Sequence, residues 1–392
     1  MKKCPIMKQC GGCTYGNIAY EEQIKKKQEF VQKLFPKYKV KPVVQMEDPY
    51  NYRHKIYATF AKDKNKKVIA GTYAEKSHFV LKNADCFIQH QQANEIIQTV
   101  CDIANQMHLE AYDEDRRTGV LRHLYIRISH STGDVLLTIV IGSKQLPGSK
   151  DFVKRILEKH PCIKTIVLNF NDKNTSMILG DREKVLFGKG YITDNLCGFD
   201  FRISPKSFFQ VNPVQTEKLY HIAVECAGLK KSDVVLDAYC GIGTISLIAS
   251  PYVKQVYGVE INKQAVQDAI GNAKLNHVDN VRFECDDAEK YMEKMRGQFD
   301  VAFIDPPRSG STYKFLNALV KANPKKIVYV SCNPVTQKRD TEILMKKGYR
   351  IKEIIPVDQF PFTEHVETVC LLYHQKKDFI LVTYGPKDAD YL

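Results

Sequence analysis

The sequence has no tryptophan and no long apolar run. None of its 392 residues belongs to a stretch approaching the roughly 18 apolar residues that mark a membrane-spanning helix, which argues against membrane insertion through a helix. The basic residues at the amino terminus, in MKKCPIMKQC, are not followed by an apolar segment as they would be in a secretory signal. These absences lead us to expect a cytoplasmic protein without a membrane partner.

The charge is distributed unevenly along the chain. The net charge is +13, and residues 1–200 contain 32 Lys and Arg against 22 Asp and Glu, whereas residues 201–392 contain 26 against 23. This bias predicts a module that binds a polyanion, followed by a nearly neutral catalytic module, although a basic surface can also serve solubility alone. The 21 Tyr and 19 Phe can stack on nucleic-acid bases.

Twelve cysteines in a chain without a secretory signal favour metal binding or catalysis over disulfides. Three of them, Cys4, Cys10 and Cys13, fall within ten residues, and the glycines between the last two allow a tight loop. Cys86 follows a turn-like Asn-Ala-Asp and is the candidate for a fourth ligand. Four thiolates fit a [4Fe–4S] cluster or a structural zinc ion. Zinc ribbons more often have two CxxC pairs and this chain has one, so the spacing favours the cluster; four unrelated buried thiols are the remaining alternative.

Helix and strand patterns in the first half predict an α+β module over residues 40–200. It belongs to a domain of residues 1–203, in which the segment 1–16 and Cys86 carry the thiol site. Basic and aromatic residues interleave in its first strand, which suits RNA but also an ordinary edge strand. The expected elements are a helix at 20–35, a strand at 52–60, a helix at 93–108, a hairpin of 121–129 and 135–141, a helix at 150–160 and a strand at 163–170.

The second half, residues 204–392, has the pattern of a nucleotide-binding α/β domain. An apolar strand leads through a glycine-containing turn into a helix, and the next two strands end in acidic residues. These parts are the strand 234–236, the turn 237–244, the strand 255–259 before Glu260 and the strand 281–284 before Asp287. Acidic side chains at consecutive strand ends suit the ribose and adenine of S-adenosylmethionine, although any one of them alone is more often a solvated loop residue.

Two further strands end in residues whose side chains can take part in a reaction. The strand 327–331 ends at Cys332, where an Asn-Pro pair forces a sharp turn. In open α/β sheets ligands bind at this edge, so the cysteine is either a nucleophile or a small buried side chain. The strand 301–304 ends in Asp305, which two prolines hold at the same edge. If the two strands are neighbours, Asp305 and Cys332 face one pocket.

Five motifs in the second half resemble those of the RNA uridine C5-methyltransferases, in the same order and with matching spacing. They are FQVN at 209–212, DAYCGIGT at 237–244, DPPR at 305–308, SCNP at 331–334 and HVET at 365–368. The four cysteines resemble the [4Fe–4S] site of the family's ribosomal RNA members. The resemblance implies a Rossmann-like S-adenosylmethionine-dependent methyltransferase domain after an RNA-binding α+β domain.

Many relatives begin with an additional RNA-binding (TRAM) barrel, and this chain begins at the cysteines. It therefore resembles the short ribosomal members most, which implies 23S ribosomal RNA as the substrate. Short transfer-RNA members also lack the barrel but usually lack the cluster, so transfer RNA remains an alternative. We expect a monomer by default.

The resemblance also implies roles for single residues. Cys332 is the expected nucleophile that adds to C6 of the uracil, and Glu367 is the expected base that removes the C5 proton. The expected contacts to S-adenosylmethionine are Gln210, Tyr239, Thr244, Glu260, Asp287 and Asp305. Three other functions remain open: an adenine N6-methyltransferase, which leaves Cys332 without a task, an RNA cytosine C5-methyltransferase, and a non-catalytic iron–sulfur RNA-binding protein.

Overall fold

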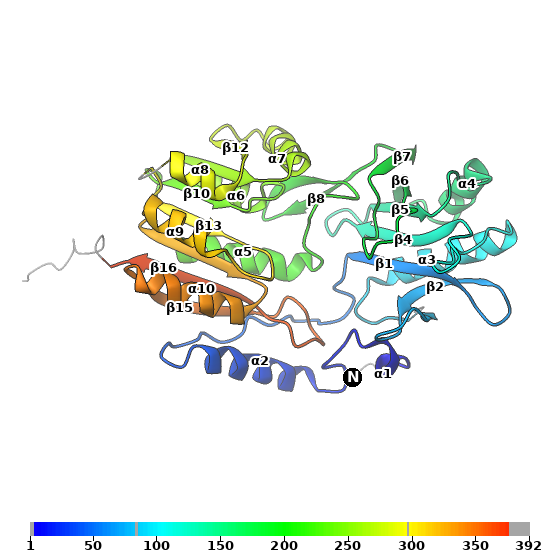
Figure 1. Cartoon of the computed structure of the whole chain (residues 1–392), viewed down its shortest axis with the longest axis horizontal. Coiled ribbons are helices and arrows are strands. Elements are labelled where there is room, and N and C mark those ends of the chain that lie inside the picture. The colour runs from blue at the N-terminus through cyan, green and yellow to red at the C-terminus, as the bar shows by residue number, and fades with distance from the viewer. Residues whose placement is uncertain (1–3, 83–84, 296–297, 376–392) are drawn as a thin grey trace, which may run out of the picture.

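The computed structural model describes residues 4–82, 85–295 and 298–375. Two seven-stranded sheets lie at opposite ends of the long axis of the molecule (Figure 1), and β8 (Ile192–Leu196) and β9 (Phe199–Ile203) form a separate hairpin. No helix of the described chain is long and apolar enough to cross a membrane.

The first sheet has the strand order β3-β2-β1-β4-β5-β6-β7 and is antiparallel except for the pair β5–β6. Its strands are β1 (Lys55–Lys62), β2 (Val68–Tyr73), β3 (Val80–Lys82), β4 (Leu121–Ile128), β5 (Val135–Ile141), β6 (Ile163–Phe170) and β7 (Arg182–Phe187). Helices α3 (Gln91–Gln106) and α4 (Ser149–Lys159) pack together on one face and share its apolar core. The predicted hairpin is confirmed as the antiparallel pair β4–β5.

The strand expected at 52–60 begins later, at Lys55. The amides of Arg53 and His54 donate to Ile88 and Val211, at 2.9 and 2.8 Å, rather than to a sheet neighbour. Asn51 has φ 52°, which turns the backbone before the strand. These tertiary bonds explain why the aromatic and basic pattern overestimates the strand at this end.

The second sheet has the order β12-β11-β10-β13-β14-β16-β15, in which the first five strands are parallel and β16 is inserted antiparallel between β14 and β15. Its strands are β10 (Val234–Ala238), β11 (Gln255–Glu260), β12 (Val281–Cys285), β13 (Val301–Ile304), β14 (Lys326–Ser331), β15 (Tyr349–Val357) and β16 (Glu367–His374). The α/β arrangement expected for the second half is confirmed.

Alternate residues of these strands enter two different cores, as the period-two geometry of a strand requires. One core includes α5, α6 and α7, and the other includes α8, α9 and α10, so the sheet is the middle of three layers. The helices are α5 (Pro213–Ala227), α6 (Thr244–Ala249), α7 (Lys263–Leu275), α8 (Ala288–Lys294), α9 (Tyr313–Ala322) and α10 (Pro334–Lys346), with a 3-10 turn at Ser250–Tyr252.

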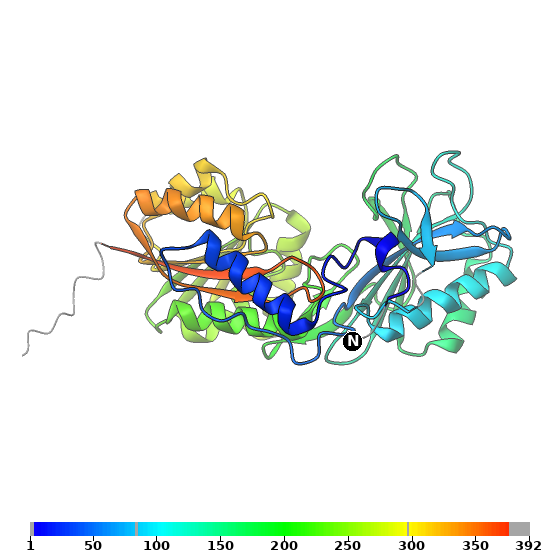
Figure 2. The same cartoon turned by 90° about the horizontal axis from the view of Figure 1, so that it is seen from below.

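The second helix of the chain packs on the second sheet, whereas the residues before it lie against β1 and β2 of the first. After the short α1 (Met7–Cys10), helix α2 (Tyr20–Leu34) lies along β15 and α10 (Figure 2). Val31 and Phe35 enter the core that includes α8, α9 and α10. The helix expected at 20–35 is thus confirmed, and residues that precede the first sheet in sequence contact the second. The division into domains 1–203 and 204–392 stays a prediction.

Candidate active site

Three strand ends of the second sheet bring Asp305, Cys332 and Glu367 to one edge. Asp305 follows the last paired residue of β13, which is parallel to β14. In the antiparallel pair β14–β16 the last two opposed residues are Ser331 and Thr368, so Cys332 and Glu367 occupy the next opposed positions. The condition for Asp305 and Cys332 to face one pocket is confirmed, because β13 and β14 are neighbours, and Asp305 is near enough to raise the pKa of Cys332. The shared pocket stays a prediction.

Burial and mutual repulsion raise the pKa of each of these acidic groups. Burial, followed by the neighbouring Glu367 and Asp305, raises the pKa of the half-buried Cys332 to about 11, although Arg308 acts in the opposite direction. The pKa of Glu367 is well above its usual range through burial and then Asp305. That of Asp305 is raised to about 7 through burial and then Asp237. A positively charged group at this edge would favour their ionised forms.

The turn that carries Cys332 is fixed by the residue after it. Asn333 caps α10, because its side-chain oxygen accepts from the amide of Val335 at 3.2 Å. Its own amide donates to Ser331 at 3.1 Å, and its side-chain Nδ2 donates to the carbonyl of Arg308 at 3.1 Å. One asparagine thus connects the SCNP turn to the DPPR loop and sets the distance between Cys332 and Arg308.

A buried carboxylate on α10 holds the rest of that loop, residues 305–311. Asp340 is fully buried and accepts from the amide of Ser311 and the hydroxyl of Tyr329, both at 2.7 Å. Arg339 pairs with it at 2.7 Å. The sequence analysis did not identify Asp340, since a single acid inside a helix gives no local signal of this role.

The glycine-containing turn after β10 has an unusual backbone. Tyr239 and Gly243 have φ of 67° and 85°, and a Cβ on Gly243 would lie 2.6 Å from the ring of Phe283. The turn is closed by Glu260, the last residue of β11, whose carboxylate accepts from the amide of Gly241 at 3.2 Å. Two of the expected cofactor residues, Tyr239 and Glu260, therefore lie on adjoining strand ends.

Inside this turn lies a carboxyl group that the sequence analysis did not single out. Asp237 accepts from the hydroxyl of Ser246 at 2.6 Å, and its other oxygen is buried and accepts no hydrogen bond from the described residues. Burial raises its pKa to about 7. Asp237 thus extends the acidic edge from Asp305 toward the glycine-containing turn.

Asp287 has a structural task in addition to its expected one. It caps α8 by accepting from the amides of Glu289 and Lys290, at 2.9 and 3.2 Å, through the same oxygen. It also lies near Tyr239, whose pKa is raised to about 12 by burial and, to a smaller extent, by Asp287. The structure therefore places both residues beside the glycine-containing turn.

Tyr220 on α5 connects the remaining expected cofactor residues. It is buried, and the side chains of Thr244 and Gln210 lie close enough to its hydroxyl to lower its pKa. Burial and then Asp305 raise its pKa. Thr244 and Gln210 are thereby linked to the acidic edge. Nothing in the local sequence around Tyr220 distinguishes it from the other buried residues of the helix.

The four expected thiols also come together. Cys4, Cys10, Cys13 and Cys86 line one cavity of about 160 Å³. Burial raises the pKa of Cys13 to about 12, and the other three cysteines add to that rise. Within residues 4–82, 85–295 and 298–375, no three His, Cys, Asp or Glu side chains are arranged to hold one metal ion.

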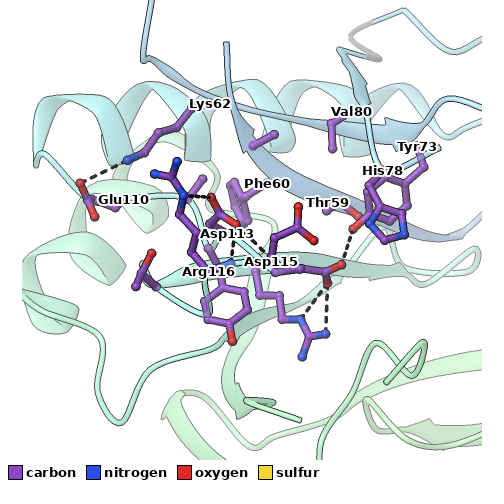
Figure 3. A pocket seen from close by; sticks show the side chains of 16 residues that line it. Thr59, Phe60, Lys62, Tyr73, His78, Val80, Glu110, Asp113, Asp115 and Arg116 are labelled. Atoms are coloured by element: carbon purple, nitrogen blue, oxygen red, sulfur yellow. Dashed lines mark hydrogen bonds and ion pairs between the residues drawn. The ribbon is translucent and has the colours of Figure 1, made fainter. Parts of the chain in front are cut away.

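A larger cavity, of about 370 Å³, opens on the first sheet away from all of these residues. Its charged side chains largely pair with one another (Figure 3). Arg122 donates to Glu114 at 3.1 Å, and Lys62 donates to Glu110 at 3.2 Å. None of the expected site residues lines it, so we assign it no part in the chemistry.

Comparison with known proteins gives the same reading of the second sheet. Residues 19–375 match the model of the tRNA (uracil-5-)-methyltransferase family. An uncharacterized RNA methyltransferase of Oceanobacillus iheyensis is 43% identical over 373 residues, 93% of this chain and 81% of the relative. One from Halalkalibacterium halodurans is 40% identical over 378 residues, 94% and 82% of the two chains.

A solved structure agrees over both sheets. The Pyrococcus abyssi tRNA (uracil-54, C5)-methyltransferase in complex with S-adenosyl-L-homocysteine superposes with a TM-score of 0.79 at 27% identity, over 95% of this chain and 87% of that one. With the fold, the strand-end residues and a family match over most of its length, the chain belongs to the tRNA (uracil-5-)-methyltransferase family and is an S-adenosylmethionine-dependent RNA methyltransferase of the uracil-C5 type.

Proposed function

We propose that the protein methylates C5 of a uridine in 23S ribosomal RNA through a covalent bond between Cys332 and C6 of the uracil. The observation that carries the mechanism is the register of β14 and β16, which puts a thiol and a buried carboxyl group at opposed positions. A C6 nucleophile and a C5 base must act on adjacent carbons of one ring, and this pair meets that requirement.

The Cys332 thiolate adds to C6, and the electron pair of the C5–C6 double bond moves into an enolate that makes C5 nucleophilic. C5 would take the methyl group of bound S-adenosylmethionine, and the electron pair of the broken sulfur–methyl bond would stay on the sulfur of the departing S-adenosylhomocysteine. Glu367 then takes the C5 proton. The electron pair of the C5–H bond re-forms the double bond, and the sulfur leaves C6 as thiolate. Cys332 is regenerated and Glu367 carries the proton until solvent removes it.

The charges around Cys332 support its proposed attack as a thiolate. The pKa of Cys332, about 11, leaves little thiolate at neutral pH unless positive charge is near. Arg308 lowers that pKa, and a sulfonium at the acidic edge would lower it further. For the cofactor itself we propose contacts from Gln210, Tyr239, Thr244, Glu260, Asp287 and Asp305, to which the structure adds Tyr220 and Asp237 as neighbours.

The first sheet supplies cations for the RNA. Lys55 lines a small cavity together with Gln210, and Arg127, which also lines it, is buried and donates to the carbonyl of Ser207. The Lys55 ammonium lies 5.1 Å from the ring of Phe208, which is 62% exposed. A cation beside an exposed ring suits a phosphate and a stacked base. Because the target must leave its stack at a cost of a few kcal/mol, we expect a uridine in a loop or a single strand.

We propose that Cys4, Cys10, Cys13 and Cys86 hold a [4Fe–4S] cluster with a structural role. The number and kind of donors support this proposal, because four thiols line one cavity of about 160 Å³ and repulsion among their thiolates would favour a positively charged partner. Methyl transfer requires no electrons, so no redox step is assigned. The resemblance of these cysteines to ribosomal RNA methyltransferases is also what favours 23S ribosomal RNA over transfer RNA.

The test uses RNA in which 5-fluorouridine replaces uridine. Fluorine cannot leave C5 as a proton does, so protein and RNA should stay covalently joined on a denaturing gel, in an S-adenosylmethionine-dependent manner. We expect the adduct with 23S ribosomal RNA and its loss in Cys332→Ala. An adduct with transfer RNA alone would identify transfer RNA as the substrate and would still support the covalent mechanism. No adduct with either, in protein that binds the cofactor, would refute the covalent mechanism.

A further inference from the structure

Glu367 depends on a loop that the amino-terminal segment holds in place. Residues 358–366 connect β15 to β16, and Glu367, the first residue of β16, pairs with Val357, the last residue of β15. The shape of this loop, which we call the base loop, therefore decides where β16 begins and how Glu367 lies beside Cys332. Within the base loop, Phe362 has φ 66°, a conformation that a bulky residue adopts only when its surroundings enforce it.

A buried ion pair fixes the start of the base loop. Lys27 on α2 and Asp358 have fully buried side chains and approach to 2.5 Å. The Lys27 ammonium also donates to the carbonyl of Phe360 at 3.0 Å, and Tyr20 donates to the other oxygen of Asp358 at 2.7 Å. Burial lowers the pKa of Lys27 and Asp358 opposes that effect. A buried pair with these additional bonds resists displacement, since breaking it leaves a charge uncompensated.

Three more bonds hold the middle of the base loop. The amide of Phe362 donates to Gln23 at 2.8 Å, and its carbonyl accepts from the amide of Tyr15 at 2.9 Å. The amide of Glu364 donates to the hydroxyl of Thr14 at 2.9 Å. The backbone of the base loop is thus held by three hydrogen bonds to the segment 14–23, one to a backbone amide and two to side chains.

The segment that makes these bonds is continuous with the thiol site. Cys13 directly precedes Thr14, and Phe87, which directly follows Cys86, packs edge-on against the ring of Phe362 with centroids 4.9 Å apart. Two of the four thiols are therefore one residue away from groups that hold the base loop. A shift of either cysteine moves a direct contact of that loop.

We propose that the thiol site positions Glu367 through Thr14, Gln23 and Phe87, so that its state controls removal of the C5 proton but not addition or methyl transfer. The inference rests on the covalent mechanism proposed above. When the base loop is displaced, the methylated intermediate forms on Cys332 but keeps its C5 proton, and the C6–sulfur bond stays intact. The distinctive consequence is an accumulated protein–RNA adduct on ordinary uridine.

The experiment compares Gln23→Met and Thr14→Val with the control Glu22→Gln, whose carboxylate pairs with Lys26 at 3.6 Å on the exposed side of α2. Full-length proteins are mixed with unmodified substrate RNA and S-adenosylmethionine. Methyl incorporation in the first turnover, the steady-state rate and the fraction of denaturant-stable adduct are measured. Hydrogen exchange of the base loop is followed in parallel, because Gln23 and Thr14 bond directly to its amides.

For Gln23→Met we expect the steady-state rate to fall roughly 10- to 100-fold, as misplacement of a catalytic group by about 1 Å can cause. First-turnover methylation should persist, the adduct should accumulate and the base loop should exchange faster. Thr14→Val, an exposed position, should show the same pattern more weakly. Equal loss of first-turnover and steady-state rates, or unchanged exchange in the base loop, would overturn the inference.

The thiol site itself is tested with Cys13→Ser and Phe87→Leu. Both should accumulate the adduct and loosen the base loop, and an adduct fraction equal to that of Glu22→Gln in folded protein would contradict the coupling. Wild-type protein on 5-fluorouridine RNA distinguishes a failure of the covalent mechanism from a failure of the coupling between the thiol site and Glu367. If it forms no adduct, the covalent mechanism fails; if it does and the variants behave as the control, only the coupling fails.

Discussion

The two sheets bury charges of opposite sign. On the second sheet, burial raises the pKa of Asp237 and Asp305 to about 7 and that of Glu367 well above its usual range. On the first sheet, burial lowers the pKa of His54 to about 3 and that of Lys55 to about 7. In each case loss of solvation is the leading cause, and it favours the neutral form.

This opposition matches the charges of the two ligands. A sulfonium is positive and RNA is negative, and each would restore the ionised form of the side chains around it. In the free protein the shifted pKa values favour the uncharged forms of these side chains, which limits the free-energy cost of burying them.

The sharpest difference between the regions is their sensitivity to a single substitution. Cys332→Ala should lower methylation by at least about a thousandfold, because loss of a covalent nucleophile removes the reaction path itself. Binding of S-adenosylmethionine should persist, as measured by calorimetry. Cys285→Ala, at an exposed cysteine on the end of β12, is the matched control. Measurable turnover by Cys332→Ala would mean that the second sheet is not the site of a covalent step.

The framework under the acidic edge should be the next most sensitive. Asp340→Asn keeps one acceptor oxygen, which the amide of Ser311 and the hydroxyl of Tyr329 already share, but it replaces the other oxygen by an NH₂ group and removes the charge that Arg339 pairs with. We expect the free energy of unfolding to fall by about 2–4 kcal/mol and methylation to fall with displacement of the DPPR loop. Urea denaturation measures the first quantity.

The control for this substitution is Glu342→Gln on the same helix, whose carboxylate makes an exposed pair with Lys338 at 3.5 Å. It should change stability by less than about 0.5 kcal/mol. Equal effects of the two substitutions would show that burial of Asp340 does not support the edge.

Sequence patterns located the parts of the site that are local. The turn after β14 was expected because an Asn-Pro pair must end a strand, and the acidic strand ends were expected because parallel strands share an edge. Tyr220 and Asp340 were missed, since each lies inside a helix and meets the site only through tertiary packing. Neither the tyrosine nor the aspartate has a sequence neighbourhood that indicates such a contact.

Strand order was the second thing that the sequence did not contain. Alternation of apolar residues assigns faces but not neighbours, so insertion of β16 between β14 and β15 was not foreseen, and β15 itself was missed. The opposed positions of Cys332 and Glu367, and the base loop with its contacts to α2, all follow from that insertion. The motif HVET therefore pointed to Glu367 as the expected base without showing why it lies opposite Cys332.

On the first sheet a single cation should matter less, because several share the RNA. Lys55→Met should weaken RNA binding by roughly tenfold and lower the slope of log affinity against log salt by about one. Since the pKa of Lys55 is about 7, wild-type affinity should fall as pH rises through neutrality, and the variant should lose that dependence. Lys64→Met, at an exposed position between β1 and β2, should leave both quantities unchanged. Fluorescence anisotropy over a salt and pH series provides the measurement.

The smallest expected effect is a shift in pH dependence with two opposite signs. Only the thiolate of Cys332 reacts, so adduct formation on 5-fluorouridine RNA should accelerate from pH 7 toward the pKa of about 11. Arg308 lowers this pKa and Glu367 raises it. Arg308→Gln should therefore move the rising limb to higher pH, whereas Glu367→Gln should move it to lower pH. Arg308→Lys, which keeps the positive charge, is the control. Because Arg308 is exposed and screened by salt, its removal should change the rate at neutral pH by less than about tenfold. If both substitutions shift the pH dependence of adduct formation in the same direction, something other than the charges around Cys332 determines its rising limb.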